Sequence, residues 1–193
     1  FKDYLLGQGV NDKQIIYYPY YAESFYDIVV PSTNIKQTFP KGLNIVFAGN
    51  IGVAQSFDTI INAVKIASEK IDNFTLIVLG EGRDKKRILD KINSMNLNNH
   101  FKFLGSFPPE KMPEFFASAD ALLVSLKKTK IFSMTIPGKL QSYLACGRPI
   151  IASLDGIGAE IIKESYCGYV SPSEDYEGLA KSIISFNNST EEK

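Results

Sequence analysis

Residues 43–52 read Leu-Asn-Ile-Val-Phe-Ala-Gly-Asn-Ile-Gly, an apolar run that passes directly into a glycine-rich loop. The run Leu43–Ala48 is typical of a strand buried on both faces. A helix is predicted after the loop, because apolar residues recur there at the spacing of one helix face, namely Phe57, Ile60, Ile61, Val64 and Ala67. A strand, a glycine loop and a helix in this order indicate the first unit of a parallel α/β sheet.

The same alternation continues along the chain. Further strands are predicted at residues 74–79, 101–104, 121–124, 149–152 and 168–170, with helical patterns between them. Parallel strands need crossover connections, which are right-handed in nearly all proteins. The sequence therefore predicts an α/β fold: a doubly wound, Rossmann-like parallel sheet of about five or six strands, with helices on both faces.

Composition and charge exclude several classes of protein. The 193 residues are 45% apolar and 22% charged, which is ordinary for a globular domain. Lysine plus arginine and aspartate plus glutamate both number 21, which argues against a polycationic fold for nucleic acid. The two cysteines lack metal-ligand spacing, and the single histidine, His100, argues against a zinc enzyme or a Ser-His-Asp hydrolase. We expect no metal, no cofactor and no nucleic-acid partner.

Residues 1–40 differ from the rest of the chain in being rich in tyrosine and proline. We predict a short helix within residues 1–9, a short strand at Gln14–Tyr18, and a connector that lies across the domain formed by residues 41–193. Its tyrosines are expected to cover apolar surface, with a binding role as the alternative. Because the chain opens with Phe1 and not Met, we expect it to be a piece of a longer protein.

Two loops have the features of anion sites. Gly49, Asn50 and Gly52 lie between a strand and a helix, where glycine lets the backbone approach a phosphate and helix amides favour an anion. The spacing matches neither G-x-G-x-x-G nor a Walker A motif, so NAD and ATP fit poorly. In Ile136-Pro137-Gly138-Lys139, proline suits a first helical turn and lysine adds a cation. Taken alone, a plain helix cap with a solvated lysine explains this segment equally well.

Together these loops predict a diphosphate site. We expect Gly52 and Gly138 to lie at helix starts on the same edge of the sheet. Their free amides would then converge on one cleft, with the Lys139 side chain nearby.

The order of several segments resembles the C-terminal half of retaining GT-B glycosyltransferases that use nucleotide sugars (glycosyltransferase family 4, or group 1). The resemblance covers roughly residues 42–186. It is most similar to the L-fucosamine transferase-like subgroup. It rests on the loop at Gly49 and on Leu79-Gly80-Glu81-Gly82, Phe103-Leu104-Gly105-Ser106-Phe107, Ala119-Asp120-Ala121, residues 143–152, Gly156-Ile157-Gly158-Ala159-Glu160 and Gly168-Tyr169-Val170.

The resemblance implies a function for residues 41–193. This half of the fold binds a nucleotide diphosphate sugar, expected to be UDP-linked, and the sugar passes to a glycan or lipid-linked acceptor in surface polysaccharide biosynthesis, such as capsule or O-antigen. The acceptor-binding N-terminal domain would be missing, with residues 1–40 as its end and the interdomain connector, and the isolated domain would be inactive. A cytoplasmic location is implied, with the missing domain reaching the cytoplasmic face of the membrane.

The resemblance also implies the site residues. The backbone of Ser106 and Phe107 would face the base, and the diphosphate and leaving sugar would be held by Gly49, Asn50, Gly52, Pro137, Gly138 and Lys139. Gly80 and Ser142 complete the expected site.

This chain departs from the family pattern at two pairs of positions. The usual glutamate pair falls on Met134 and Ser142, and the usual basic pair falls on Asn50 and Gln55, so Lys139 would replace the lost positive charge. No residue is identified as catalytic. A sugar-nucleotide 2-epimerase-like enzyme and a non-catalytic module that binds a nucleotide or a protein partner remain alternatives.

Overall fold

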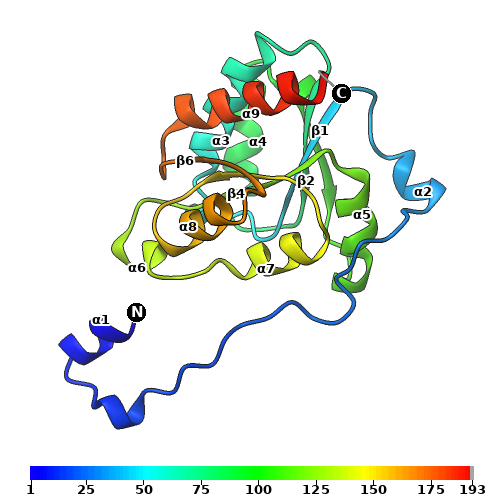
Figure 1. Cartoon of the computed structure of the whole chain (residues 1–193). Coiled ribbons are helices and arrows are strands. Elements are labelled where there is room, and N and C mark those ends of the chain that lie inside the picture. The colour runs from blue at the N-terminus through cyan, green and yellow to red at the C-terminus, as the bar shows by residue number, and fades with distance from the viewer. Residues whose placement is uncertain (192–193) are drawn as a thin grey trace.

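Figure 1 shows the computed structural model of the chain, in which residues 1–191 are described. Six strands within these residues form one sheet in the order β3-β2-β1-β4-β5-β6, and every neighbouring pair is parallel. The strands are β1 (Leu43–Ala48), β2 (Phe74–Leu79), β3 (Phe101–Gly105), β4 (Ala121–Ser125), β5 (Ile150–Ser153) and β6 (Gly168–Ser171). The predicted doubly wound parallel sheet is confirmed.

Helices cover both faces of the sheet, and each face has its own apolar core. One core joins the sheet to α3 (Phe57–Ser68), α4 (Lys85–Ser94) and α9 (Tyr176–Glu191). The other joins it to α5 (Met112–Ser118), α7 (Gly138–Ala145) and α8 (Ile157–Glu164). Strands β1 and β4 are buried at every position, as a strand with helices on both sides must be. In residues 1–191, no helix has the length and apolar character needed to cross a bilayer.

Shorter helices lie outside this framework. They are α1 (Lys2–Gly7), α2 (Thr33–Lys36), α6 (Lys130–Ser133) and four 3-10 turns at Asp12–Gln14, Val53–Gln55, Asn98–His100 and Pro109–Lys111. The helix expected at residues 1–9 is therefore present as α1. The short helices α2 and α6 have no amphipathic repeat long enough to be recognised in the sequence.

The order of the strands reverses between β1 and β4, which is the position where open α/β sheets bind ligands. These two strands pair only at Ile45 with Ala121 and at Val46 with Leu122. Further along β1, the Ala48 N–H instead donates a hydrogen bond of 3.0 Å to the hydroxyl of Tyr143 on α7. The sheet therefore opens at its C-terminal edge, and α7 lies at the opening.

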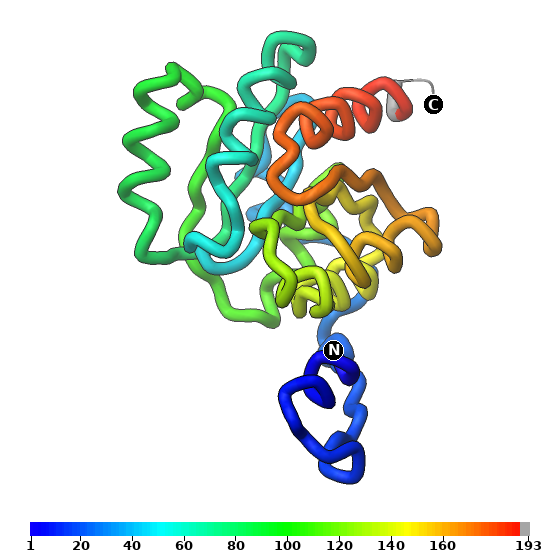
Figure 2. Tube along the Cα trace, turned by 90° about the vertical axis from the view of Figure 1, so that its left-hand side faces the viewer, coloured from blue at the N-terminus to red at the C-terminus, as the bar shows by residue number. Residues whose placement is uncertain are grey.

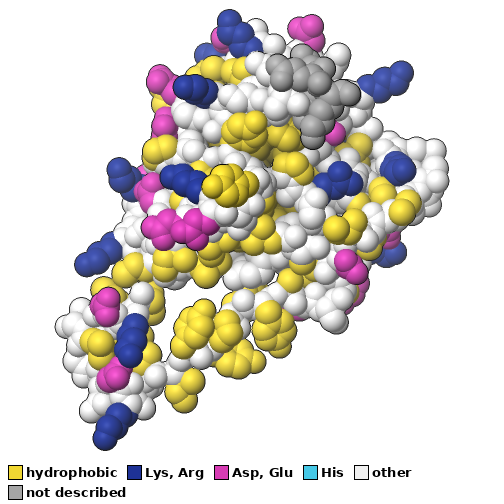
Figure 3. All heavy atoms as spheres, viewed as in Figure 1, with side chains coloured by type: hydrophobic (Ala, Val, Ile, Leu, Met, Phe, Trp, Pro, Cys, Tyr) yellow, Lys and Arg dark blue, Asp and Glu magenta, His cyan; other side chains and the backbone are white. Residues whose placement is uncertain are grey.

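The connector differs from its prediction in two ways. The strand predicted at Gln14–Tyr18 is wrong, because Gln14 ends a 3-10 turn and the residues after it form neither helix nor strand. A strand needs a partner edge, and this segment runs away from the sheet, as Figures 1 and 2 show. Of the tyrosines expected to cover apolar surface, four are between 60% and 84% exposed, namely Tyr17, Tyr18, Tyr20 and Tyr21, and Figure 3 shows apolar side chains along this segment.

The second half of the connector does lie against the domain. Tyr26 stacks on Phe116 of α5 with ring centroids 6.2 Å apart and an interplanar angle of 9°. The Ser32 N–H donates to Glu114 at 2.9 Å, and the side chain of Asn44 donates to the carbonyl oxygen of Pro40 at 2.9 Å. The prediction that residues 1–40 lie across the domain thus holds only from about residue 20 onward.

Replacing Tyr143 with phenylalanine tests the contact at the sheet opening. The Tyr143→Phe variant leaves the Ala48 N–H buried without a partner, which costs about 1–3 kcal/mol of unfolding free energy. Urea denaturation measures this difference. Tyr166→Phe is the matched control, because Tyr166 is 94% exposed. Equal unfolding free energies for Tyr143→Phe and the parent would contradict the assigned role of this hydrogen bond.

Candidate functional site

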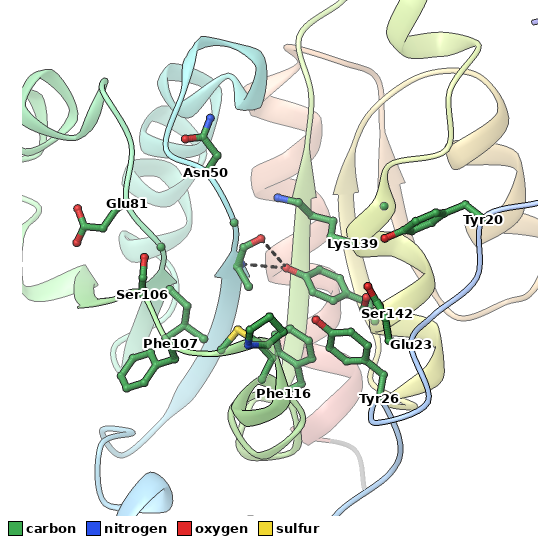
Figure 4. A pocket seen from close by; sticks show the side chains of 18 residues that line it. Tyr20, Glu23, Tyr26, Asn50, Glu81, Ser106, Phe107, Phe116, Lys139 and Ser142 are labelled. Atoms are coloured by element: carbon green, nitrogen blue, oxygen red, sulfur yellow. Dashed lines mark hydrogen bonds between the residues drawn. The ribbon is translucent and has the colours of Figure 1, made fainter.

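A cleft of about 500 Å³ lies at the C-terminal edge of the sheet, beside the opening between β1 and β4. Its walls come from the loops that follow β1, β2 and β3, from α5, from α7 and from the connector, as Figure 4 shows. The polar and glycine positions that line it are Gly49, Asn50, Gly80, Glu81, Ser106, Gly138, Lys139, Ser142, Tyr20, Glu23 and Tyr26.

Two glycines allow the loops after β1 and β2 to pack closely beneath the cleft. Gly49 has a φ of +136° and Gly80 a φ of +143°, which side chains rarely adopt. A Cβ on Gly80 would lie 1.9 Å from the carbonyl oxygen of Gly49. The Gly49 N–H donates a hydrogen bond to the carbonyl oxygen of Leu79, and the Gly80 N–H donates one to the carbonyl oxygen of Gly105, each at 2.8 Å. These two glycines therefore allow the two loops to pack closely. Their N–H groups already donate hydrogen bonds within the protein and are not free to bind a ligand.

Lys139 carries the unusual electrostatics of the cleft. It is the second residue of α7, and its amino group lies 3.9 Å from the centroid of the Phe47 ring. The side chain as a whole is half-buried, but the amino nitrogen is shielded from solvent and has no hydrogen-bond partner among the described residues. Burial lowers the pKa of Lys139 from its usual 10.5 to about 7. An unpaired buried amine is costly, and an anion close to it would offset that cost.

The N-terminus of α7 lies at the same end of the cleft. The first amides of a helix have no intrahelical partner, and the helix dipole places partial positive charge there. Gly138 opens α7, and the ring of Tyr20 lies 3.4 Å from the position that a Cβ on Gly138 would occupy. The cleft thus has a buried amine and a helix N-terminus at one end, and both kinds of group favour anions.

The opposite part of the cleft is apolar. Phe107 is 40% exposed, and its ring centroid lies 4.5 Å from that of Phe115. Met112 and Phe116 line the same region. Exposed aromatic faces of this kind can stack on a flat heterocycle.

Most of the residues predicted for the site meet in this cleft. Eight line it, namely Gly49, Asn50, Gly80, Ser106, Phe107, Gly138, Lys139 and Ser142. Of the loops at the C-terminal edge, the one at residues 153–158 contributes no lining residue in the described chain.

Gly52 and Pro137 do not line the cleft, and the prediction of two converging helix starts is wrong. Gly52 precedes a 3-10 turn, and α3 begins only at Phe57, after Ser56 in a left-handed conformation with a φ of 47°. The first residues of α3 therefore do not line the cleft, and α7 is the helix that contributes its N-terminus there among the described residues. Pro137 caps α7 and packs toward Gly158 of α8.

The positions that depart from the family pattern are divided by the fold. Ser142 and Asn50 line the cleft, whereas Met134 ends the short helix α6 and Gln55 lies in the 3-10 turn, and neither is a lining residue. The carboxylates that do line the cleft are Glu23 and Glu81. Within residues 1–191, no three His, Cys, Asp or Glu side chains gather in a way that could hold a metal ion.

The sequence prediction missed the part of the site that comes from the connector. Tyr20, Glu23 and Tyr26 line the cleft although they precede the first strand by more than fifteen residues. The unusual density of tyrosine in this segment was the available signal. It was interpreted as surface cover because the segment lacks the strand-loop-helix pattern that marks the rest of the site.

Comparisons with known proteins identify a family and several similar folds. The family Glycosyl transferases group 1 matches residues 32–193. An uncharacterized glycosyltransferase of Methanocaldococcus jannaschii is 29% identical over 97% of this chain and 48% of its own length. The Anabaena protein HepE in complex with UDP-glucose has a TM-score of 0.79 at 16% identity, over 98% of this chain and 52% of HepE.

A domain solved by itself is also similar. The C-terminal domain of the group 1 glycosyl transferase LpcC from Francisella tularensis has a TM-score of 0.60 at 19% identity, over 84% of this chain and 95% of that domain. These structures confirm that the fold is that of the C-terminal half of a GT-B glycosyltransferase. The chain spans half or less of the length of the curated relatives it matches.

The buried amine predicts how stability depends on pH. Between pH 7 and pH 10.5 the unfolded chain binds a proton at Lys139 that the folded chain lacks, so the free energy of unfolding rises with pH in this window. The contribution is roughly 2 kcal/mol between pH 7 and pH 9. Lys139→Met removes it. Urea denaturation of both proteins at the two pH values measures the difference, and identical pH dependence would show that the amine is solvated.

Proposed function

The chain belongs to the Glycosyl transferases group 1 family, and from this membership we propose that it is the donor-binding half of a retaining glycosyltransferase. The donor is a nucleotide diphosphate sugar, with UDP as the nucleotide. The buried, unpartnered amino group of Lys139 at the α7 N-terminus carries this proposal. A cation held in that position has no partner until an anion enters the cleft.

The three regions of the cleft correspond to the parts of such a donor. The diphosphate fits the end formed by Lys139 and the first turn of α7, and the base fits the apolar end at Phe107 and Phe116. In HepE the bound ligand is UDP-glucose, which has the same parts in the same order. A cleft of about 500 Å³ is within the range of small-molecule sites.

The same groups supply the proposed chemistry. When the bond between the sugar and the diphosphate breaks, negative charge increases on the leaving phosphate. Lys139 and the α7 amides stabilise that charge in a partly dry site, which lowers the barrier without a metal. The residues that act on the acceptor come from the other half of the protein.

The connector supports the proposal of a further domain. Its exposed apolar side chains include Ile16, Tyr17, Tyr18 and Val30, which are between 78% and 87% exposed, and Figure 3 shows apolar side chains along this segment. We propose that an N-terminal acceptor-binding domain packs there. The acceptor is a glycan or a lipid-linked sugar in surface polysaccharide assembly, in the manner of the L-fucosamine transferase-like subgroup.

A sugar-nucleotide 2-epimerase is less well supported by the site. Such an enzyme needs a histidine and carboxylates in the cleft, and the single histidine lies elsewhere. His100 contacts the carbonyl oxygen of Phe74, the first residue of β2, at the opposite edge of the sheet from the cleft. A non-catalytic nucleotide-binding module would share the cleft, and only transfer by the complete protein separates it from an enzyme.

Replacing Lys139 tests the anion site. At pH 6.5, where the amine is largely charged, Lys139→Ala should weaken UDP binding by roughly tenfold, or about 1.4 kcal/mol. His100→Ala is the control and should bind like the parent, because it lies at the far edge of the sheet. Isothermal titration calorimetry with UDP measures both. Parent-like affinity for Lys139→Ala would remove this residue from the site.

The pH dependence of binding gives a second test with a different readout. Above pH 7 the empty site must take up a proton to present a charged Lys139, so the affinity for UDP-glucose should fall as the pH rises and level off near that of Lys139→Ala, roughly tenfold below the affinity of the charged form. UDP-glucose is the appropriate probe because its diphosphate diester does not titrate in this range. Titrations at pH 6.5, 7.5 and 8.5 should show the decline in the parent, while Lys139→Ala should bind weakly at all three. A flat parent profile would contradict the role of the amine.

A further inference from the structure

The connector contributes one acidic side chain to the cleft, and its position is held by the surrounding contacts. The Tyr26 N–H donates to the carbonyl oxygen of Glu23 at 3.0 Å, which closes a tight turn. Tyr26 itself stacks on Phe116, and its ring centroid lies 4.6 Å from that of Phe25. Glu23 is therefore anchored to the domain through Tyr26, even though the chain before it runs out into solvent.

The Glu23 carboxylate is available to a ligand. Glu81, the other acidic residue lining the cleft, holds the amino group of Lys85 at 2.7 Å. Among the described residues, no ion pair or side-chain hydrogen bond is formed by the Glu23 carboxylate. Its charge acts on the Tyr26 phenol, whose pKa is raised by burial and further by Glu23.

Glu23 lines the wall of the cleft that α7 and the connector form. Ser142 follows Lys139 by three residues, so both lie on one face of α7, with Ser142 about 4.5 Å further from the helix N-terminus. Ser142 lies close enough to the Tyr26 phenol to lower its pKa, against the larger effect of burial, which raises it. Figure 4 shows Glu23 next to Ser142, between Tyr20 and Tyr26. Glu23, Ser142 and Tyr26 therefore form one polar wall of the cleft, on the side of α7 and the connector.

A nucleoside diphosphate has a hydroxyl-bearing ribose between its base and its phosphates. A carboxylate accepts two hydrogen bonds from neighbouring hydroxyls well, and it repels a phosphate placed too close. Carboxylates recognise ribose in this way in dinucleotide-binding sheets. The free carboxylate and the ribose thus coincide once the diphosphate lies at Lys139.

We propose that Glu23 is a specificity-determining residue that accepts hydrogen bonds from the ribose hydroxyls of the bound nucleotide. The inference rests on the proposed function and adds to it. The ribose is read by the connector and not by the sheet-and-helix framework that holds the diphosphate. The nucleotide site is then complete only when residues 20–26 are in place.

The test compares two ligands on matched variants of the whole chain. Calorimetry is carried out with UDP and with 2′,3′-dideoxy-UDP on the parent, Glu23→Gln and Glu23→Ala, with Glu164→Gln on the exposed end of α8 as the control. For UDP, Glu23→Ala should lose about tenfold in affinity and Glu23→Gln less. For the dideoxy ligand the parent and both variants should bind alike, because that ligand lacks the hydroxyls. Urea unfolding of each variant checks that the substitutions at Glu23, which is exposed, leave the unfolding free energy unchanged.

The possible results separate the two proposals. Equal losses for UDP and dideoxy-UDP, or an unchanged or tighter UDP affinity in Glu23→Ala, would overturn the ribose assignment. If Lys139→Ala still loses UDP binding in that case, the proposed function stands without it. If a folded parent binds neither ligand, the proposed function fails first and the assignment fails with it.

Discussion

The hydrogen bond between the Tyr143 hydroxyl and the Ala48 N–H holds the functional part of this molecule together. Strands β1 and β4 pair at only two positions, so the end of β1 needs another partner, and α7 supplies it. The same contact sets where α7 begins relative to the loop after β1. Lys139 lies one turn before Tyr143, and its amino group is therefore brought over Phe47 and against Gly49. A structural requirement of the sheet opening thus places the cation of the cleft.

The buried amine of Lys139 lowers the stability of the folded protein when no ligand is bound. Its nitrogen has no hydrogen-bond partner in the described structure, and its pKa of about 7 reflects the loss of water around the charge. An anion entering the cleft would restore a partner and favour the charged form. Ligand binding, protonation and stability are then linked through one side chain, and the first turn of α7 adds its dipole to the same end.

The two halves of the connector differ in how firmly they are attached to the domain. From about residue 25 onward it is fixed by stacking on Phe116 and by hydrogen bonds to α5 and to the start of β1. Before that point its tyrosines are exposed and the chain runs away from the sheet. Glu23 lies at the boundary between these parts. A segment that reaches both the cleft and the exposed surface is well placed to couple the nucleotide site to whatever packs on that surface.

The periodicity of the sequence was enough to predict the parallel sheet, because each strand and helix buries a face whose spacing is visible locally. Eight of the ten residues expected for the site, some from the glycine loops and others from the family resemblance, line the cleft at the C-terminal edge. The sequence could not place Gly52 outside the cleft, because a 3-10 turn and the left-handed Ser56 depend on packing around α3. Nor could it reveal that Lys139 is buried without a partner, or that Glu23 joins Ser142 across more than a hundred residues. Those features arise from contacts between distant segments, and only the tertiary structure brings such segments together.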